Sequence, residues 1–139
     1  MQGFFQQFLR LYRPLTNKLN ELLAEFGLSY SLWQVIFYIK NMGPSQLSSI
    51  SAYFYIERPS VTRVVQQLEE KGLVEHVPGQ DKRQKSIQLT EHGVAIYHAC
   101  REKISELEHS MLADIPDETL QTAFDLFPEI RQNLIEKEE

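Results

Sequence analysis

Residues 57–93 read ERPSVTRVVQQLEEKGLVEHVPGQDKRQKSIQLTEHG. Pro59 stands near the start of a polar run, and proline is favoured in the first turn of a helix because its missing N–H has no helical partner there. Lys71 followed by Gly72 is typical of a helix end, where a cation meets the negative terminus and glycine adopts a left-handed conformation. The run therefore predicts one helix between these two signals.

Two short segments follow that helix. Residues 73–77 and 85–89 alternate apolar and polar side chains, as the strands of a half-buried antiparallel pair do. The loop between them, residues 78–83, is basic, and Thr90 after the second segment can cap a further helix. We expect a mainly α fold with a small β-hairpin wing (α+β).

The residues before this stretch predict two more helices. Residues 31–42 are largely apolar and stop at a Gly-Pro pair. Ser45 is a plausible N-cap for a short helix over residues 46–51, and residues 53–55 then form the turn into the next helix. Together the elements predict a winged helix-turn-helix, in which one helix enters the DNA major groove and the hairpin reaches the neighbouring minor groove.

The polar run carries two distinct faces when its residues are placed at 100° intervals. Val61, Val65 and Leu68 fall on one face, and Arg63 and Gln66 point directly opposite. Arginine pairs with guanine edges and glutamine with adenine edges, and flanking hydroxyls serve either bases or backbone. An ordinary solvated face is the simpler interpretation of this helix alone. The wing downstream is what favours DNA contact.

Both ends of the chain carry apolar helical patterns. Pro14 lies inside the first pattern and should kink the helix or mark its effective start, and Gly27 should end it. Thr90 begins a long helix, and Pro128 should kink or split the last one. The terminal helices carry more apolar surface than a domain of this size can cover alone, which predicts a homodimer.

The wing segment resembles the signature of MarR-type regulators, an Asp-x-Arg pair followed by Leu-Thr-x-x-Gly. The matching positions are Asp81, Arg83, Leu89, Thr90 and Gly93. Residues 68–74, LEEKGLV, are similar to the family's segment at the end of the recognition helix. The resemblance covers nearly the whole chain. It implies a two-fold dimer on a palindromic operator, with Arg83 inserted into the minor groove and Asp81 bracing the wing tip.

These patterns and the resemblance together give one expected organisation. The chain is one MarR-like domain over residues 1–139, with dimerisation helices at about 1–26 and 94–139 and the DNA-binding region at 31–93. Double-stranded DNA is the expected partner. The candidate DNA-contacting residues are Ser45, Arg58, Ser60, Thr62, Arg63, Gln66, Gln67, Asp81, Lys82, Arg83 and Lys85.

A net charge of −5 is unusual for a DNA-binding protein, so its distribution matters. Residues 58–90 hold six Lys or Arg against four Asp or Glu, whereas residues 91–139 hold four against twelve. Local charge sets phosphate attraction, because the Debye length is only about 8 Å at physiological salt. The acidic total lowers the expected non-specific affinity and is compatible with specific binding.

Composition indicates a soluble protein of the cytoplasm, with 42% hydrophobic and 24% charged residues. No apolar run approaches the length that spans a bilayer, so no membrane partner is expected. The N-terminal residues are too interrupted by Gln and Arg to be a signal-peptide core. Cys100 is the one cysteine, which excludes an intrachain disulfide and suits a reducing compartment.

The sequence contains only weak signals for catalysis, metal binding or thiol redox chemistry. No Ser-His-Asp arrangement, glycine-rich phosphate loop or spaced carboxylate pair predicts catalysis or a cofactor, so we expect no enzyme. His98 with Glu102 has helical ligand spacing, but solvated helix charges are far commoner, and no metal site is predicted. Cys100 could be a redox sensor, as in some relatives, but a buried structural thiol is the favoured interpretation.

The resemblance also implies a small aromatic or phenolic effector. Tyr12, Trp33 and Phe37 are the candidate ligand-binding residues, although aromatic residues at helical spacing are more often plain core. The favoured function is thus a homodimeric, ligand-responsive regulator, with repression favoured over activation. The alternative is a winged-helix protein-interaction module without DNA binding, which the acidic balance leaves open.

Overall fold

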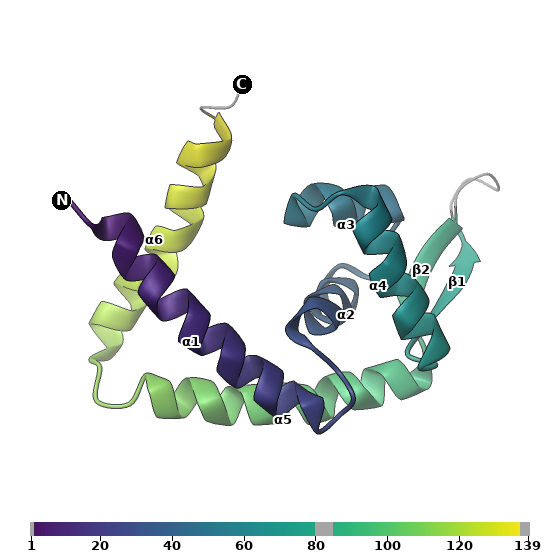
Figure 1. The fold of residues 1–139 in the computed structure, drawn as a ribbon, viewed down its shortest axis with the longest axis horizontal. Coiled ribbons are helices and arrows are strands. Elements are labelled where there is room, and N and C mark those ends of the chain that lie inside the picture. The colour runs from purple at the N-terminus through teal and green to yellow at the C-terminus, as the bar shows by residue number, and fades with distance from the viewer. Residues whose placement is uncertain (1, 80–84, 137–139) are drawn as a thin grey trace. The chain divides into compact units, whose positions relative to one another are not determined.

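The computed structural model describes residues 2–79 and 85–136, and Figure 1 shows their elements in chain order. The helices are α1 (Phe4–Ala24), α2 (Tyr30–Met42), α3 (Leu47–Phe54), α4 (Arg58–Glu70), α5 (Glu91–Met111) and α6 (Asp117–Glu136), and the strands are β1 (Val74–Pro78) and β2 (Lys85–Leu89). The chain divides into two compact units, Met1–Ile104 and Ser105–Glu139. The predicted fold class, mainly α with one hairpin, is confirmed.

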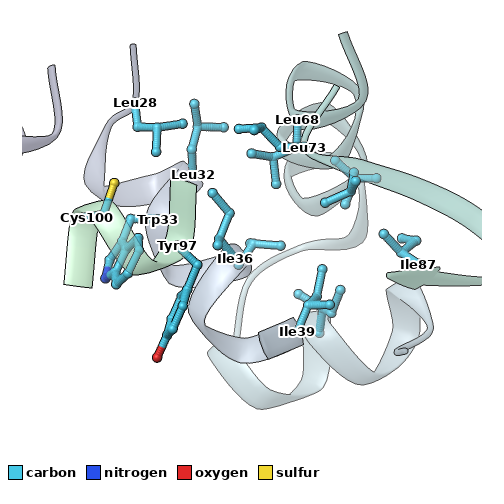
Figure 2. Packing of buried hydrophobic residues seen from close by; sticks show 14 of the residues in the cluster. Leu28, Leu32, Trp33, Ile36, Ile39, Leu68, Leu73, Ile87, Tyr97 and Cys100 are labelled. Carbon is cyan, nitrogen blue, oxygen red and sulfur yellow. The ribbon is translucent and has the colours of Figure 1, made fainter. Parts of the chain in front are cut away.

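The core of the first unit gathers around α2. Trp33, Ile36 and Ile39 are buried on this helix and share one cluster with Leu68 of α4 and Ile87 of β2 (Figure 2). α2 packs against α1, α4 and β2, and α3 packs against α4. Full burial of each such side chain contributes roughly 1.5–3 kcal/mol relative to exposure. α2 is therefore the platform that positions both α4 and the hairpin.

α4 begins and ends where its sequence signals predict. Pro59 lies in its first turn, and Gly72 just beyond its end has a φ of 73°. The Gly72 N–H donates to the Glu69 carbonyl and the Leu73 N–H to the Leu68 carbonyl, both at 2.9 Å. This pair of bonds is a Schellman motif, which satisfies the last helical carbonyls. The chain consequently turns directly from α4 into β1.

The hairpin is bonded on both sides of β2. β1 and β2 pair antiparallel, with Val74 opposite Leu89. On the other edge, the Ser45 N–H donates to the Ile87 carbonyl at 3.0 Å, and the Ile87 N–H donates to the Ser45 carbonyl at 2.8 Å. The connection between α2 and α3 thus adds a one-residue bridge to the sheet and fixes the base of the wing.

This bridge explains why the predicted N-cap of the short helix is wrong. Gln46 takes the N-cap position without a side-chain cap bond, and the Ser45 hydroxyl donates to the Gly43 carbonyl at 2.8 Å. The helix also runs longer than predicted because Phe54 packs against the core cluster. Residues 55–57 connect α3 to α4, and Tyr55 has a left-handed φ of 54°, whereas Tyr53 and Phe54, predicted in the turn, lie in the helix.

Thr90 joins β2 to α5 and caps that helix, as predicted. Its Oγ1 accepts a hydrogen bond from the Gly93 N–H at 3.0 Å and donates one to the Gly72 carbonyl at 2.6 Å. Its backbone N–H donates to the Leu73 carbonyl at 3.0 Å. One residue therefore ties the end of α4, the entry to β1 and the start of α5 together.

Proline does not interrupt either terminal helix. Pro14 lies inside α1 and Pro128 inside α6, and both helices are continuous. The alternative start at Pro14 and the split at Pro128 are therefore wrong. Each proline removes one helical hydrogen bond, but both lie on exposed chain, where water can bond the freed carbonyl. α1 ends at Ala24, and Gly27, predicted to end it, follows three residues later with a φ of 71°.

Within the second unit, α6 has no buried residue in the single chain. Phe124, Phe127 and Leu134 are 74%, 55% and 64% exposed. In the first unit, Phe5 and Leu11 of α1 are 65% and 57% exposed. Isolated apolar residues at a surface are ordinary, but runs of this kind along whole helices indicate surfaces that another chain covers.

Candidate nucleic-acid interface

α4 has the two faces that its sequence predicts. Val61 and Val65 are each 2% exposed and Leu68 is fully buried, which anchors the helix on the core. Arg63 and Gln66 are exposed on the opposite side. The helix therefore presents a polar row whose direction is fixed by three buried aliphatic side chains.

The flanking residues of this row are also accessible. Arg58 and Gln67 are exposed, and Ser60 and Thr62 are half-buried. The Thr62 hydroxyl donates to the Arg58 carbonyl at 3.0 Å, so its oxygen remains an acceptor. Between Arg58 and Gln67 the row holds two cations and no acid. A surface with these donors and acceptors can contact base edges and phosphates.

Arg63 has one long contact with a neighbour on this row. One of its terminal nitrogens, Nη2, donates to the Ser60 hydroxyl at 3.4 Å. A guanidinium carries five N–H donors, so most of them stay available for a partner. At this length and exposure the bond is weak, so the guanidinium can leave Ser60 when it meets a base.

The other sequence-predicted contacts divide into three groups. Lys85 is exposed at the start of β2, opposite Pro78. Ser45 is only 8% exposed, and its hydroxyl and backbone are bonded within the fold, so the structure does not bring it onto the α4 row. Asp81, Lys82 and Arg83 lie outside the described residues.

One side-chain contact between α4 and β1 was missed by sequence reasoning. His76 Nε2 of β1 lies 2.7 Å from Glu69 Oε1 of α4, and the side chains are 40% and 37% exposed. The two residues are seven apart, but a helix end, a glycine turn and a strand start lie between them. Neither the helical nor the strand period connects such positions, so no sequence signal would have found the pair.

Two of the three candidate effector residues meet in one pocket. Trp33 and Phe37 line a pocket of about 300 Å³ together with Tyr30, Tyr38 and Tyr53. Tyr12 is not among its lining residues. Trp33 is 6% exposed and stacks on Tyr97 with ring centroids 5.4 Å apart, so it also belongs to the core. Burial, followed by the nearby Tyr12 hydroxyl, raises the pKa of Tyr30.

Cys100 is a structural residue of the core. Its side chain is fully buried on α5, and burial raises the pKa of the thiol to about 11. A protonated, inaccessible thiol is a poor nucleophile. The interpretation as a buried structural thiol is therefore supported, and the geometry disfavours a redox sensor at this position.

Two further features are absent from the described part of the chain. Within residues 2–79 and 85–136, no three His, Cys, Asp or Glu side chains gather closely enough to hold a metal ion. Over the same residues, no helix combines the length and the apolar content needed to cross a membrane.

Comparison with known proteins identifies what this arrangement is similar to. Residues 26–84 match the model of the MarR family. An uncharacterized HTH-type transcriptional regulator of Bacillus subtilis, YwoH, is 36% identical over 115 residues, which cover 83% of this chain and 84% of YwoH.

Solved structures share the fold over almost the whole chain. A Staphylococcus aureus MarR in complex with salicylate and kanamycin has a TM-score of 0.87 at 26% identity and covers 97% of this chain and 92% of its own. A mutant MarR from Escherichia coli, complexed with operator DNA, has a TM-score of 0.81 at 20% identity and covers 93% and 94%. The second likeness is one of fold alone.

Proposed function

The chain belongs to the MarR family of DNA-binding transcriptional regulators, and from that premise we propose that it is a homodimeric, ligand-responsive repressor of a palindromic operator. The observation that carries the proposal is the accessible row on α4, anchored by buried aliphatic residues and followed by a hairpin. Such a row fits the major groove, while the hairpin fits the neighbouring minor groove. A protein bound across a promoter represses by occlusion.

The proposed DNA contacts are the sequence-predicted residues with one exception. Arg63 and Gln66 would read base edges, and Arg58, Ser60, Thr62 and Gln67 would serve bases or backbone. Lys82, Arg83 and Lys85 would serve the wing, with Asp81 bracing it. Ser45 is left out because its polar groups are bonded inside the fold.

The terminal helices support the dimer. We assign residues 1–26 and 94–139 to dimerisation and residues 31–93 to DNA binding, in one MarR-like domain. α1 and α6 each carry exposed apolar residues, among them Leu11 and Phe124, and we propose that a second copy covers both helices. Two copies related by a two-fold axis would present their α4 rows about one helical turn of DNA, ~34 Å, apart.

The effector is proposed to be a small aromatic or phenolic molecule. The Staphylococcus aureus neighbour is described in complex with salicylate, an aromatic of this class. The pocket lined by Trp33 and Phe37 has mainly aromatic walls, and Tyr30 and Tyr38 are also among its lining residues. An effector that binds better to a dimer whose two α4 rows are at the wrong spacing for the operator would release the DNA. We further propose a cytoplasmic protein without enzymatic activity.

Selection of bound duplexes from a random DNA pool tests the proposal. Paired half-sites related by a two-fold axis are expected, with affinity that falls steeply as salt rises. Sedimentation should give a folded dimer at micromolar concentration. A protein that enriches no sequence and binds without salt dependence would favour the interaction-module alternative instead.

A further inference from the structure

The contact between Glu69 and His76 joins the two parts of the candidate interface. Glu69 lies in the last turn of α4, which carries the proposed base-reading row. His76 is the middle residue of β1, the first strand of the wing. The 2.7 Å contact between His76 Nε2 and Glu69 Oε1 therefore spans from the helix to the wing.

Glu69 occupies a position that is electrostatically unfavourable without a partner. A carboxylate in the last turn faces the negative end of the helix dipole. It would also face the phosphates of a duplex bound along α4. His76 offers an N–H donor at this point, and a charge-assisted bond to it offsets both costs.

The base of the wing is anchored by backbone bonds and by the buried side chains of Leu73, Val74 and Ile87. Leu73 is bonded to Leu68 through the Schellman turn, and Ile87 is bonded to Ser45 on the far edge of the sheet. These contacts hold the base, whereas the next two residues of β1, Glu75 and His76, are exposed and leave the core. The contact at His76, three residues beyond Leu73, supplies a second point of attachment to α4.

We propose that Glu69 and His76 form a brace that sets the wing at the angle where its loop meets the minor groove while α4 lies in the major groove. They are positioning residues and touch no base themselves. The proposal rests on the proposed function, because it concerns how the two DNA-reading parts are held together. Both side chains are more than one-third exposed, so the brace acts through geometry and contributes little to folding.

Glu70 offers a matched control. Glu69→Ala and Glu70→Ala each remove one negative charge from the same exposed turn of α4, so their general effect on phosphate attraction is equal. His76 is bonded to Glu69 and not to Glu70. Any difference between the two variants therefore reports the partnership with His76.

The experiment measures binding to one duplex that the wild-type protein selects from a random pool. The duplex is prepared with A·T-rich and with G·C-rich flanks, because minor-groove readout depends on width and A·T content. Glu69→Ala and His76→Ala are expected to reduce the preference for A·T-rich flanks by roughly two- to fivefold, the range of an exposed ion pair. Glu70→Ala should keep the wild-type preference, and the double variant Glu69→Ala/His76→Ala should lose no more than either single variant.

Glu69→Gln serves as the conservative variant, since its amide oxygen keeps an acceptor at the same reach. It should retain most of the flank preference. Equal flank preference in Glu69→Ala and Glu70→Ala overturns the brace, while the selected duplex would still uphold the proposed function. Loss of discrimination inside the half-sites instead of at the flanks also overturns it, because α4 and not the wing would then be displaced. Failure of the wild-type protein to select any duplex overturns the proposed function and the brace with it.

Discussion

The start of α5 lies directly against the carbonyl oxygen of Leu73. A Cβ added at Gly93 would stand 2.1 Å from that oxygen and 3.0 Å from the Leu73 carbonyl carbon. Atoms of the backbone cannot move aside as the end of a flexible side chain can. The close approach between α5 and the turn that leads into β1 therefore requires glycine at position 93.

Gly93→Ala is expected to destabilise the protein by more than about 3 kcal/mol, as a substitution that forces the backbone apart does. Alanine would otherwise favour a helical position by about 0.5–1 kcal/mol. Gly72→Ala is the control, since its Cβ meets nothing within 4 Å and only the left-handed φ of 73° opposes it. Urea unfolding should give a much lower free energy of unfolding for Gly93→Ala than for Gly72→Ala. A smaller loss of stability in Gly93→Ala than in Gly72→Ala would contradict the close approach.

Arg63→Ala is expected to weaken the selected site by about 1–3 kcal/mol and to relax discrimination at one base step in each half-site. The reason is its exposed place on α4, opposite the buried Val61 and Val65. Titrations on the selected and on random duplexes check this. An equal loss on both would make Arg63 a phosphate contact.

Arg83→Ala should lower affinity most on sites with A·T-rich flanks, where the minor groove is narrow and its negative potential concentrated. Stability should change by less than about 0.5 kcal/mol, as expected for a surface loop. Arg83 lies outside the described residues, so this prediction comes from the wing signature in the sequence. Unchanged affinity on A·T-rich flanks would mean that the wing does not read DNA.

Lys82→Ala provides the contrast to Arg83→Ala within the same loop. Each lysine–phosphate contact adds to the salt dependence of binding, so removing Lys82 should lower the salt slope by roughly one unit per lost contact, independently of the flanking sequence. Binding isotherms at several salt concentrations separate this effect from groove readout.

The buried thiol predicts a specific loss of stability at alkaline pH. Burial raises the pKa of Cys100 from 9.0 to about 11, so the folded state holds a proton that the unfolded chain releases. The contribution of this thiol to the free energy of unfolding is fully present below pH 9. It is lost as the pH rises towards 11, up to about 2 kcal/mol. Unfolding free energy measured from about pH 8 to 11 should fall more steeply for the wild-type protein than for Cys100→Ala. Tyr30 also has a raised pKa and adds a decline common to both proteins.

Much of the fold follows from local sequence signals. Pro59 and Gly72 bound α4, and Thr90 caps α5, because each of these residues acts through its own backbone or an adjacent one. The polar row on α4 also follows from sequence, since a helical period separates Arg63 from Val61 and Val65. The DNA-contacting roles remain predictions.

The remaining features depend on contacts between distant segments. Ser45 satisfies the local preference for an N-cap, but pairing with Ile87 takes its backbone into the sheet instead. The partnership of Glu69 with His76 depends on how the turn directs β1, which no single period encodes. Trp33 and Phe37 line one pocket and Tyr12 does not. This difference depends on how α2 packs against its neighbours, which the helical period does not predict.

The bridge between Ser45 and Ile87 also determines which fragment of this chain is able to fold by itself. Similarity to the family model ends at residue 84, just before β2. A fragment that stops there would leave β1 as an unpaired edge, and edges of this kind promote aggregation. It would also remove Ile87, which is 1% exposed, from the core. A fragment that folds by itself is therefore expected to extend through β2 and into α5, whose Tyr97, Cys100 and Ile104 are buried in the same core. Its C-terminal boundary lies beyond residue 84, where the match to the family model ends.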